Sequence, residues 1–153
     1  MLALLAGGLV QAHVVSMSSG ELRVTGPRSA AYELRMPAYE IEHVSDPATA
    51  LLDEVSIEGA HRTSSECTQE DDTYVCTAQY AFDQDIGNAL DVRCTLFRVT
   101  VPNHVHMLYA VKGDEGDQQV FDQSSTEREM RFHPPSAVER LTKDAGGGAL
   151  RLL

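Results

Sequence analysis

Short runs of alternating apolar and polar residues recur along this chain, and turn-forming residues separate them. The alternation begins at residues 21–24 and resumes at 31–36, after the Gly-Pro turn at 26–29. Successive side chains of a strand point to opposite faces, so this pattern predicts strands with one buried face. Further strand-like segments follow at about 56–67, 73–82, 89–101, 104–112, 118–122 and 126–133. The sequence therefore predicts a mainly β protein, an antiparallel β-sandwich of the Ig-like kind, with an open barrel as the alternative.

Two short helices are expected beside the strands. Asp46 precedes Pro47, and Leu51, Leu52 and Val55 follow at helical spacing, which predicts a helix over about 46–55 with Asp46 as its N-cap. Residues 136–139 have the spacing of a capping box and predict a second short helix after the two prolines at 134–135. We expect residues 16–20 to be a polar connection before the first strand.

The chain of 153 residues, 42% of them hydrophobic, is long enough for one cored domain. Residues 1–12 carry no charge and end on Val-Gln-Ala, which indicates the remainder of a secretory signal with His13 as the mature N-terminus. A buried first strand or helix is the alternative. Residues 13–144 then form the exported domain, and residues 145–153 form a Gly-rich linker toward a C-terminal membrane part.

Charge excludes one class of partner. The formal net charge is −11, with 12 basic residues dispersed among 23 acidic ones, so a nucleic-acid-binding surface is not expected. The chain contains no 18-residue apolar run that would form a transmembrane helix. We also expect no cofactor and no catalytic site, because a nucleophile elbow, a phosphate loop and a metalloprotease helix motif are all absent.

The three cysteines of an exported chain favour one disulfide and one free thiol. A hairpin centred between Asp71 and Asp72 would set Cys67 directly opposite Cys76, so we predict a Cys67–Cys76 bond. Cys94 is a rival partner for Cys76, because both lie on apolar strand faces; otherwise Cys94 stays reduced and buried. The acidic residues at 70–72 and 114–117 are predicted to be solvated turns, since the ligand pattern of a calcium loop is missing.

Histidines give the only candidate for a metal site. His104 and His106 are two apart in a strand-like run and share one face. Together with the imidazole and free amine of His13 they could hold copper or nickel, and His43 could complete the site. The other interpretation places His104 and His106 on a polar or partner-facing sheet surface, where replacing both by Gln would change stability by less than about 1 kcal/mol. The remaining two histidines, at positions 61 and 133, are expected at the surface or in turns.

Several segments resemble one family. These are His13, residues 21–24 with 32–37, residues 120–122 with 131–132 and, above all, the Val-Thr-Val-Pro-Asn-His-Val-His run at 99–106. Over about residues 13–140 the chain resembles the extracytoplasmic N-terminal region of HupE/UreJ-like bacterial membrane proteins. The resemblance implies a domain that precedes a multi-helix membrane part and a link to nickel supply. It assigns no ligand role to His104 or His106, because the histidine motif of that family lies in the membrane part.

Two functional hypotheses follow. The first is a non-enzymatic exported β-sandwich, located at the outer face of the bacterial cytoplasmic membrane as the domain of a HupE/UreJ-like membrane protein. The alternative is a free periplasmic copper- or nickel-binding module that uses His13, His104 and His106. Stoichiometric metal binding that requires these histidines would distinguish the alternative from the first hypothesis.

Overall fold

The computed structural model describes residues 15–132. The predicted signal at 1–12, the predicted helix at 136–139 and the Gly-rich linker at 145–153 lie outside the described residues, as do His13 and His133. Within residues 15–132, no helix is long and apolar enough to cross a membrane.

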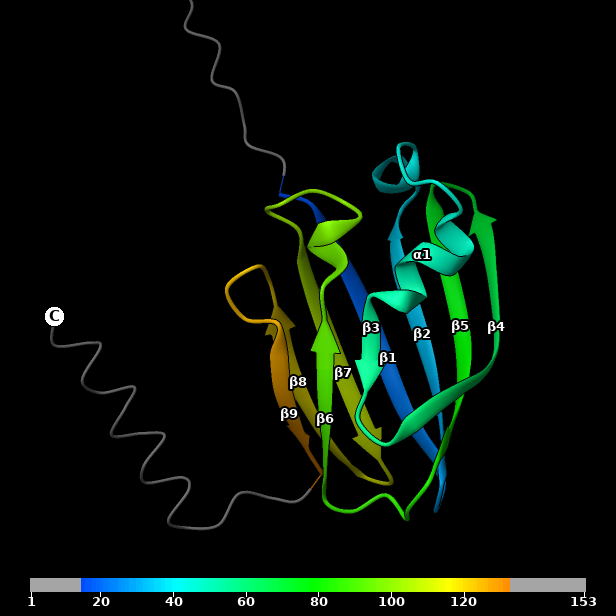
Figure 1. Ribbon diagram of the computed structural model, residues 1–153, viewed down its shortest axis with the longest axis vertical. Coiled ribbons are helices and arrows are strands. Elements are labelled where there is room, and N and C mark those ends of the chain that lie inside the picture. The colour runs from blue at the N-terminus through cyan, green and yellow to red at the C-terminus, as the bar shows by residue number, and fades with distance from the viewer. Residues whose placement is uncertain (1–14, 133–153) are drawn as a thin grey trace, which may run out of the picture.

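The described residues are mainly β and form two sheets, as the sequence predicts (Figure 1). The larger sheet has six strands in the order β4-β5-β2-β1-β7-β8, and the smaller has three in the order β3-β6-β9. The strands span β1 Met17–Gly26, β2 Ser29–Pro37, β3 Val55–Ile57, β4 Ala60–Glu70, β5 Thr73–Phe82, β6 Ala89–Cys94, β7 Val105–Lys112, β8 Glu115–Phe121 and β9 Glu127–Arg131. Short 3₁₀ helices η1 and η2 occupy Ala38–Ile41 and Leu96–Arg98.

Strand pairing is antiparallel with one exception. The predicted opening hairpin is present, since β1 pairs antiparallel with β2 in a register that sets Leu22 opposite Tyr32. On its other side β1 pairs in parallel with β7, with Ser18 opposite His106. A parallel pair needs a long crossover, and here the chain between the two strands forms β2, η1, helix α1 (Pro47–Asp53), β3–β6 and η2. The starts of β1 and β7 therefore lie at the same end of the larger sheet.

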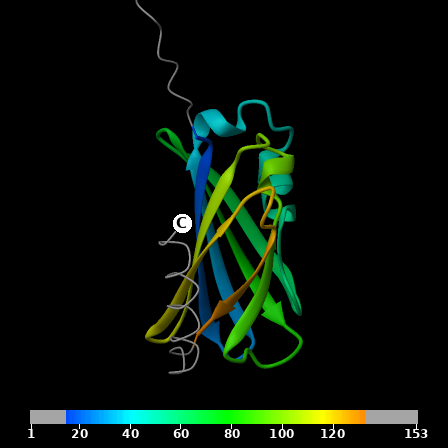
Figure 2. The same cartoon turned by 90° about the vertical axis from the view of Figure 1, so that its left-hand side faces the viewer.

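The core lies between the two sheets. Inward side chains of the larger sheet, such as Leu34 and Leu108, are about 1% exposed and belong to one cluster with Val92 and Met130 of the smaller sheet. Figure 2 shows the two sheets as two layers, and the cluster contains side chains of both. The alternation of apolar and polar residues in the sequence is thus the cause of the two-layer arrangement.

The predicted first helix is confirmed as α1, Pro47–Asp53, which lies in front of β2 and β5 in Figure 1 and buries Leu51 and Leu52 completely. Its N-cap differs from the expectation. Asp46 occupies the N-cap position, but its backbone is left-handed (φ 48°) and its side chain makes no capping hydrogen bond. Pro47 at the first helical position and the burial of the two leucines are what favour the helix here.

Several predicted boundaries differ from the structure; for example, β8 begins at Glu115, before the predicted 118. The segment 56–67 is divided into β3 and β4 by a turn at Gly59, whose φ of 75° favours glycine. The segment 89–101 ends as a strand at Cys94, and η2 follows. The expected polar connection at 16–20 is wrong, because β1 begins at Met17.

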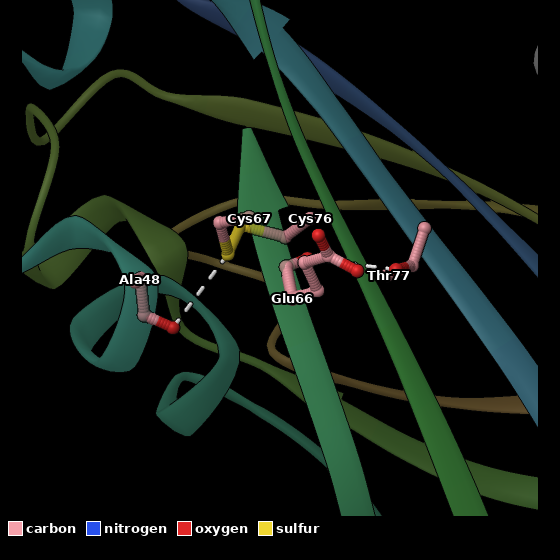
Figure 3. The surroundings of a disulfide bond; sticks show 5 residues. All are labelled: Ala48, Glu66, Cys67, Cys76 and Thr77. Atoms are coloured by element: carbon pink, nitrogen blue, oxygen red, sulfur yellow. Dashed lines mark hydrogen bonds between the residues drawn. A yellow bond between two sulfur atoms is a disulfide. The ribbon is translucent and has the colours of Figure 1, made fainter. Parts of the chain in front are cut away.

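The predicted disulfide is present. Cys67 of β4 lies opposite Cys76 of β5, and the two sulfurs are bonded (Figure 3). Cys67 Sγ also lies 3.7 Å from the carbonyl oxygen of Ala48, so the bond packs against the start of α1. Cys94 is free and buried, and burial raises the pKa of its thiol to about 11. Disulfides of this kind are typical of proteins that mature in an oxidising compartment.

We expect reduction of this disulfide to lower the free energy of unfolding by about 2–3 kcal/mol, because it closes a short loop in the unfolded chain. Urea unfolding with and without reductant measures the difference. The Cys67→Ala/Cys76→Ala variant should no longer respond to reductant, whereas Cys94→Ala should still respond. An equal midpoint in oxidised and reduced protein would contradict a stabilising role.

Candidate functional site: a buried chain of histidines and hydroxyls

Alternate residues at the start of β1 face the interior with small polar side chains. Ser16 and Ser18 are 5% and 4% exposed, and Leu22 continues the same face at 1%. From β7 and the residue before it, His106 and His104 are each 1% exposed. The parallel register of β1 and β7 brings the serines and histidines, both spaced two apart, to the same inward side.

Hydrogen bonds link these side chains to a glutamate of η1. Glu40, which is 5% exposed, accepts a hydrogen bond from Ser16 Oγ at 2.5 Å. Ser16 Oγ lies 2.6 Å from His104 Nδ1, and His104 Nε2 lies 2.8 Å from Ser18 Oγ. In Figure 2 the starts of β1 and β7 and the 3₁₀ helix η1 lie together at the upper end of the molecule.

The chain continues into the core beyond Ser18. Ser18 Oγ lies 2.7 Å from His106 Nδ1, and His106 Nε2 lies 3.0 Å from the hydroxyl of Tyr32 on β2. Every ring nitrogen of both histidines therefore has an oxygen partner. We call this set the buried chain; in order, its members are Glu40, Ser16, His104, Ser18, His106 and Tyr32.

The position of each proton in the buried chain follows from its Glu40 end, where Glu40 accepts a hydrogen bond from Ser16. Ser16 Oγ donates its single proton to Glu40, so it accepts from His104 Nδ1–H. His104 Nε2 then accepts from the Ser18 hydroxyl. By the same reasoning, Ser18 accepts from His106 Nδ1–H, and His106 Nε2 accepts from the Tyr32 hydroxyl. All hydrogen bonds run in one direction, and both neutral imidazoles carry their proton on Nδ1.

The electrostatics agree with neutral rings. Burial, followed by the neighbouring His104, lowers the pKa of His106 to about 3. Burial also lowers the pKa of His104, although Glu40 acts in the opposite direction. Burial raises the pKa of Tyr32 well above its ordinary value, so the hydroxyl retains its proton. At neutral pH both imidazoles and the Tyr32 hydroxyl of the buried chain are therefore uncharged.

Gly20, the next inward position of β1, makes room for the inner end of the chain. A Cβ atom there would lie 2.8 Å from both His106 Nε2 and a ring carbon of Tyr32. Only glycine lets the two rings approach the backbone this closely.

The expectation that His104 and His106 occupy a sheet surface is wrong. The two side chains do share one face, as their spacing predicts, but that face is the interior. Burial is tolerated because the two serines and the tyrosine satisfy every ring nitrogen. The signal in the sequence was the Ser-x-Ser-x-Gly spacing at 16–20, which matches the His-x-His spacing of the partner strand.

The other candidate metal ligands are not members of the buried chain or lie outside the described residues. His43 Nε2 lies 2.9 Å from the carbonyl oxygen of Thr100. His61 is exposed, as expected, with its Nε2 3.1 Å from the Asp83 carboxylate. Between residues 15 and 132, no group of three or more His, Cys, Asp or Glu side chains is arranged to hold a metal ion. His13, the third ligand of that hypothesis, is not described, so metal binding through it stays a prediction.

The predicted acidic turns are confirmed in part: Asp71, Asp72 and Asp114 lie in turns, whereas Glu70 ends β4 and residues 115–117 belong to β8. Asp71, with a φ of 54°, and Asp72 form the tip between β4 and β5. Gly113, with a φ of 60°, and Asp114 form the tip between β7 and β8.

The buried chain is closed to ligands in this conformation. The space beside the two imidazoles, which Cys94 and Phe121 also line, has no volume that a water molecule could occupy. The arrangement can therefore fix three chain segments to one another and can hold or release protons, but it presents no reactive atom to a substrate. Comparison with known proteins adds no further assignment, because no protein-family model and no curated protein matches this chain.

Proposed function

We propose that the chain is a non-enzymatic, exported β-sandwich that serves as the outward-facing domain of a HupE/UreJ-like membrane protein. The observation that carries the export part is the Cys67–Cys76 disulfide between paired strands, since such bonds persist in oxidising compartments. The membrane-protein part rests on the resemblance over residues 13–140.

The closed interior supports a binding or scaffold role over catalysis. The serine and histidine side chains of the buried chain that could act as nucleophile and base are buried, and they make their side-chain hydrogen bonds to one another, to Glu40 and to Tyr32. A catalytic serine and its base need access to a substrate, which this packing denies.

Thiol trapping in cells tests the export part. The full chain is expressed with its native export route, and cells are quenched with acid and labelled with a maleimide after denaturation. One label per molecule is expected without reductant, from Cys94, and three after reduction. Three labels without reductant, in a host with an oxidising periplasm, would contradict export.

The DNA downstream of codon 153 tests the membrane part. Several apolar segments of roughly 20 residues each are expected there. A stop codon at that point would remove the membrane anchor from the proposal and leave the exported domain, which thiol trapping tests separately.

A further inference from the structure

The buried chain connects segments that are distant in sequence at one end of the sandwich. Ser18 lies in β1 and His106 in β7, Ser16 and His104 lie one residue before these strands, and Glu40 lies in η1. At the same place Val105 N–H donates to the Ser16 carbonyl at 2.9 Å, where the parallel pairing of β1 with β7 begins. The side chains of the buried chain add to this pairing and join η1 to the same end of the sheet, through Glu40, Ser16 and His104.

We propose that the buried chain is a pH-sensitive latch, in which proton uptake at His104 breaks the one-way order of its hydrogen bonds and loosens the end of the sandwich where β1, η1 and β7 meet. The inference rests on contacts within the domain and does not depend on the proposed function.

Proton accounting shows why one proton is enough. A protonated His104 donates from both ring nitrogens, so Ser18 can no longer donate to it. In one arrangement Ser18 accepts hydrogen bonds from both rings, and its own proton has no acceptor. In the other, Ser18 donates to His106 Nδ1, and the His106 ring must then carry its proton on Nε2. His106 Nε2–H would point at the Tyr32 oxygen, and the Tyr32 hydroxyl would lose its acceptor. Among the described residues, that hydroxyl hydrogen-bonds only to His106. Each arrangement leaves one buried donor without a partner, which is unfavourable.

The charged groups around His104 set the pH range. Glu40 favours the protonated ring, while burial opposes it and prevails. Asp122 and Cys94 line the small space beside both rings. The Asp122 carboxylate accepts hydrogen bonds from the backbone and hydroxyl of Ser124, so its charge is held away from the rings. Cys94 and Tyr32 keep their protons, because burial raises the pKa of each. Glu40 is thus the charge that most directly favours opening.

The sign of the effect follows from the lowered pKa values. In the closed state both histidines bind protons less readily than in an open or unfolded chain. The stabilisation from the latch is therefore complete above about pH 6.5, the ordinary histidine value, and is lost progressively as the pH falls below it.

Amide hydrogen exchange of the full chain, corrected for the intrinsic effect of pH, tests the latch. Between about pH 7.5 and about pH 5 we expect exchange at residues 16–19 and 104–107 to increase about tenfold, whereas exchange in the β4–β5 hairpin stays constant. Imidazole ¹⁵N shifts should report Nδ1–H in both rings at the higher pH. Equal increases in both regions would indicate global unfolding, and no increase would mean no latch; either result overturns the proposal.

Variants separate the latch from general acid sensitivity. Glu40→Gln keeps an oxygen that accepts from Ser16 but removes the charge that favours a protonated His104, so the opening should move to lower pH by about one unit. His61→Gln, at an exposed site, should leave the transition unchanged. If Glu40→Gln opens at the same pH as the parent chain, His104 does not control the transition and the proposal is wrong.

Discussion

Replacement of His104 and His106 together by glutamine is expected to lower the free energy of unfolding by about 3–5 kcal/mol at pH 7. Both side chains are 1% exposed, and together they take part in four hydrogen bonds of the buried chain. An imidazole ring holds its donor and its acceptor nitrogen in fixed positions that point in different directions. Glutamine carries both groups on the end of a flexible side chain, so it cannot replace both hydrogen bonds. At least one buried hydroxyl would lose a partner, and the packing against Phe121 would be lost as well.

Urea unfolding at pH 7, with an unchanged m-value as the check on two-state behaviour, measures this loss. His61→Gln is the matched control, because the same substitution at an exposed histidine should cost less than about 0.5 kcal/mol. A loss below about 1 kcal/mol in the double variant is what an exposed polar face predicts. That result would mean that the hydrogen bonds of the buried chain contribute little to folding.

The fold was largely predictable because its local signals agree with one another. Alternation marked the opening hairpin, turn residues marked the acidic tips, and Pro47 with two buried leucines marked α1. The hairpin geometry also favoured Cys67 over Cys94 as the partner of Cys76, and the structure has the Cys67–Cys76 bond. In each case the relevant contacts are close in sequence or follow from the period of two along a strand.

The buried chain was not predictable in the same way, because it depends on a long-range pairing. Nothing near Ser18 indicates that His106, 88 residues away, will lie beside it. The parallel pairing of β1 with β7 decides this, and a single sequence carries no signal for which strands become neighbours. Polar residues at 16–20 therefore suggested a solvated connection, whereas their spacing of two was the mark of a strand with a polar inward face.

Gly20→Ala is expected to destabilise the domain by about 3 kcal/mol, although the change adds a single methyl group. The added carbon would lie 2.8 Å from His106 Nε2 and from a ring carbon of Tyr32, closer than such atoms approach. Neither ring can move aside freely, because Tyr32 is 2% exposed in the core and His106 is held by Ser18. The expected response is a shift of the Tyr32 ring and loss of its hydrogen bond to His106.

The matched control is Gly87→Ala. A Cβ at Gly87 would meet no atom within 4 Å, and its backbone is not in the left-handed region. This variant should be neutral or stabilising by up to about 1 kcal/mol, because alanine restricts the unfolded chain more than glycine does. Thermal unfolding of both variants beside the parent gives the comparison, and the imidazole ¹⁵N spectrum of Gly20→Ala should show a changed His106 environment. If Gly20→Ala were as stable as Gly87→Ala, the inner end of the buried chain would be able to relax around a methyl group, and the close approach of the two rings to β1 would not be a requirement of the fold.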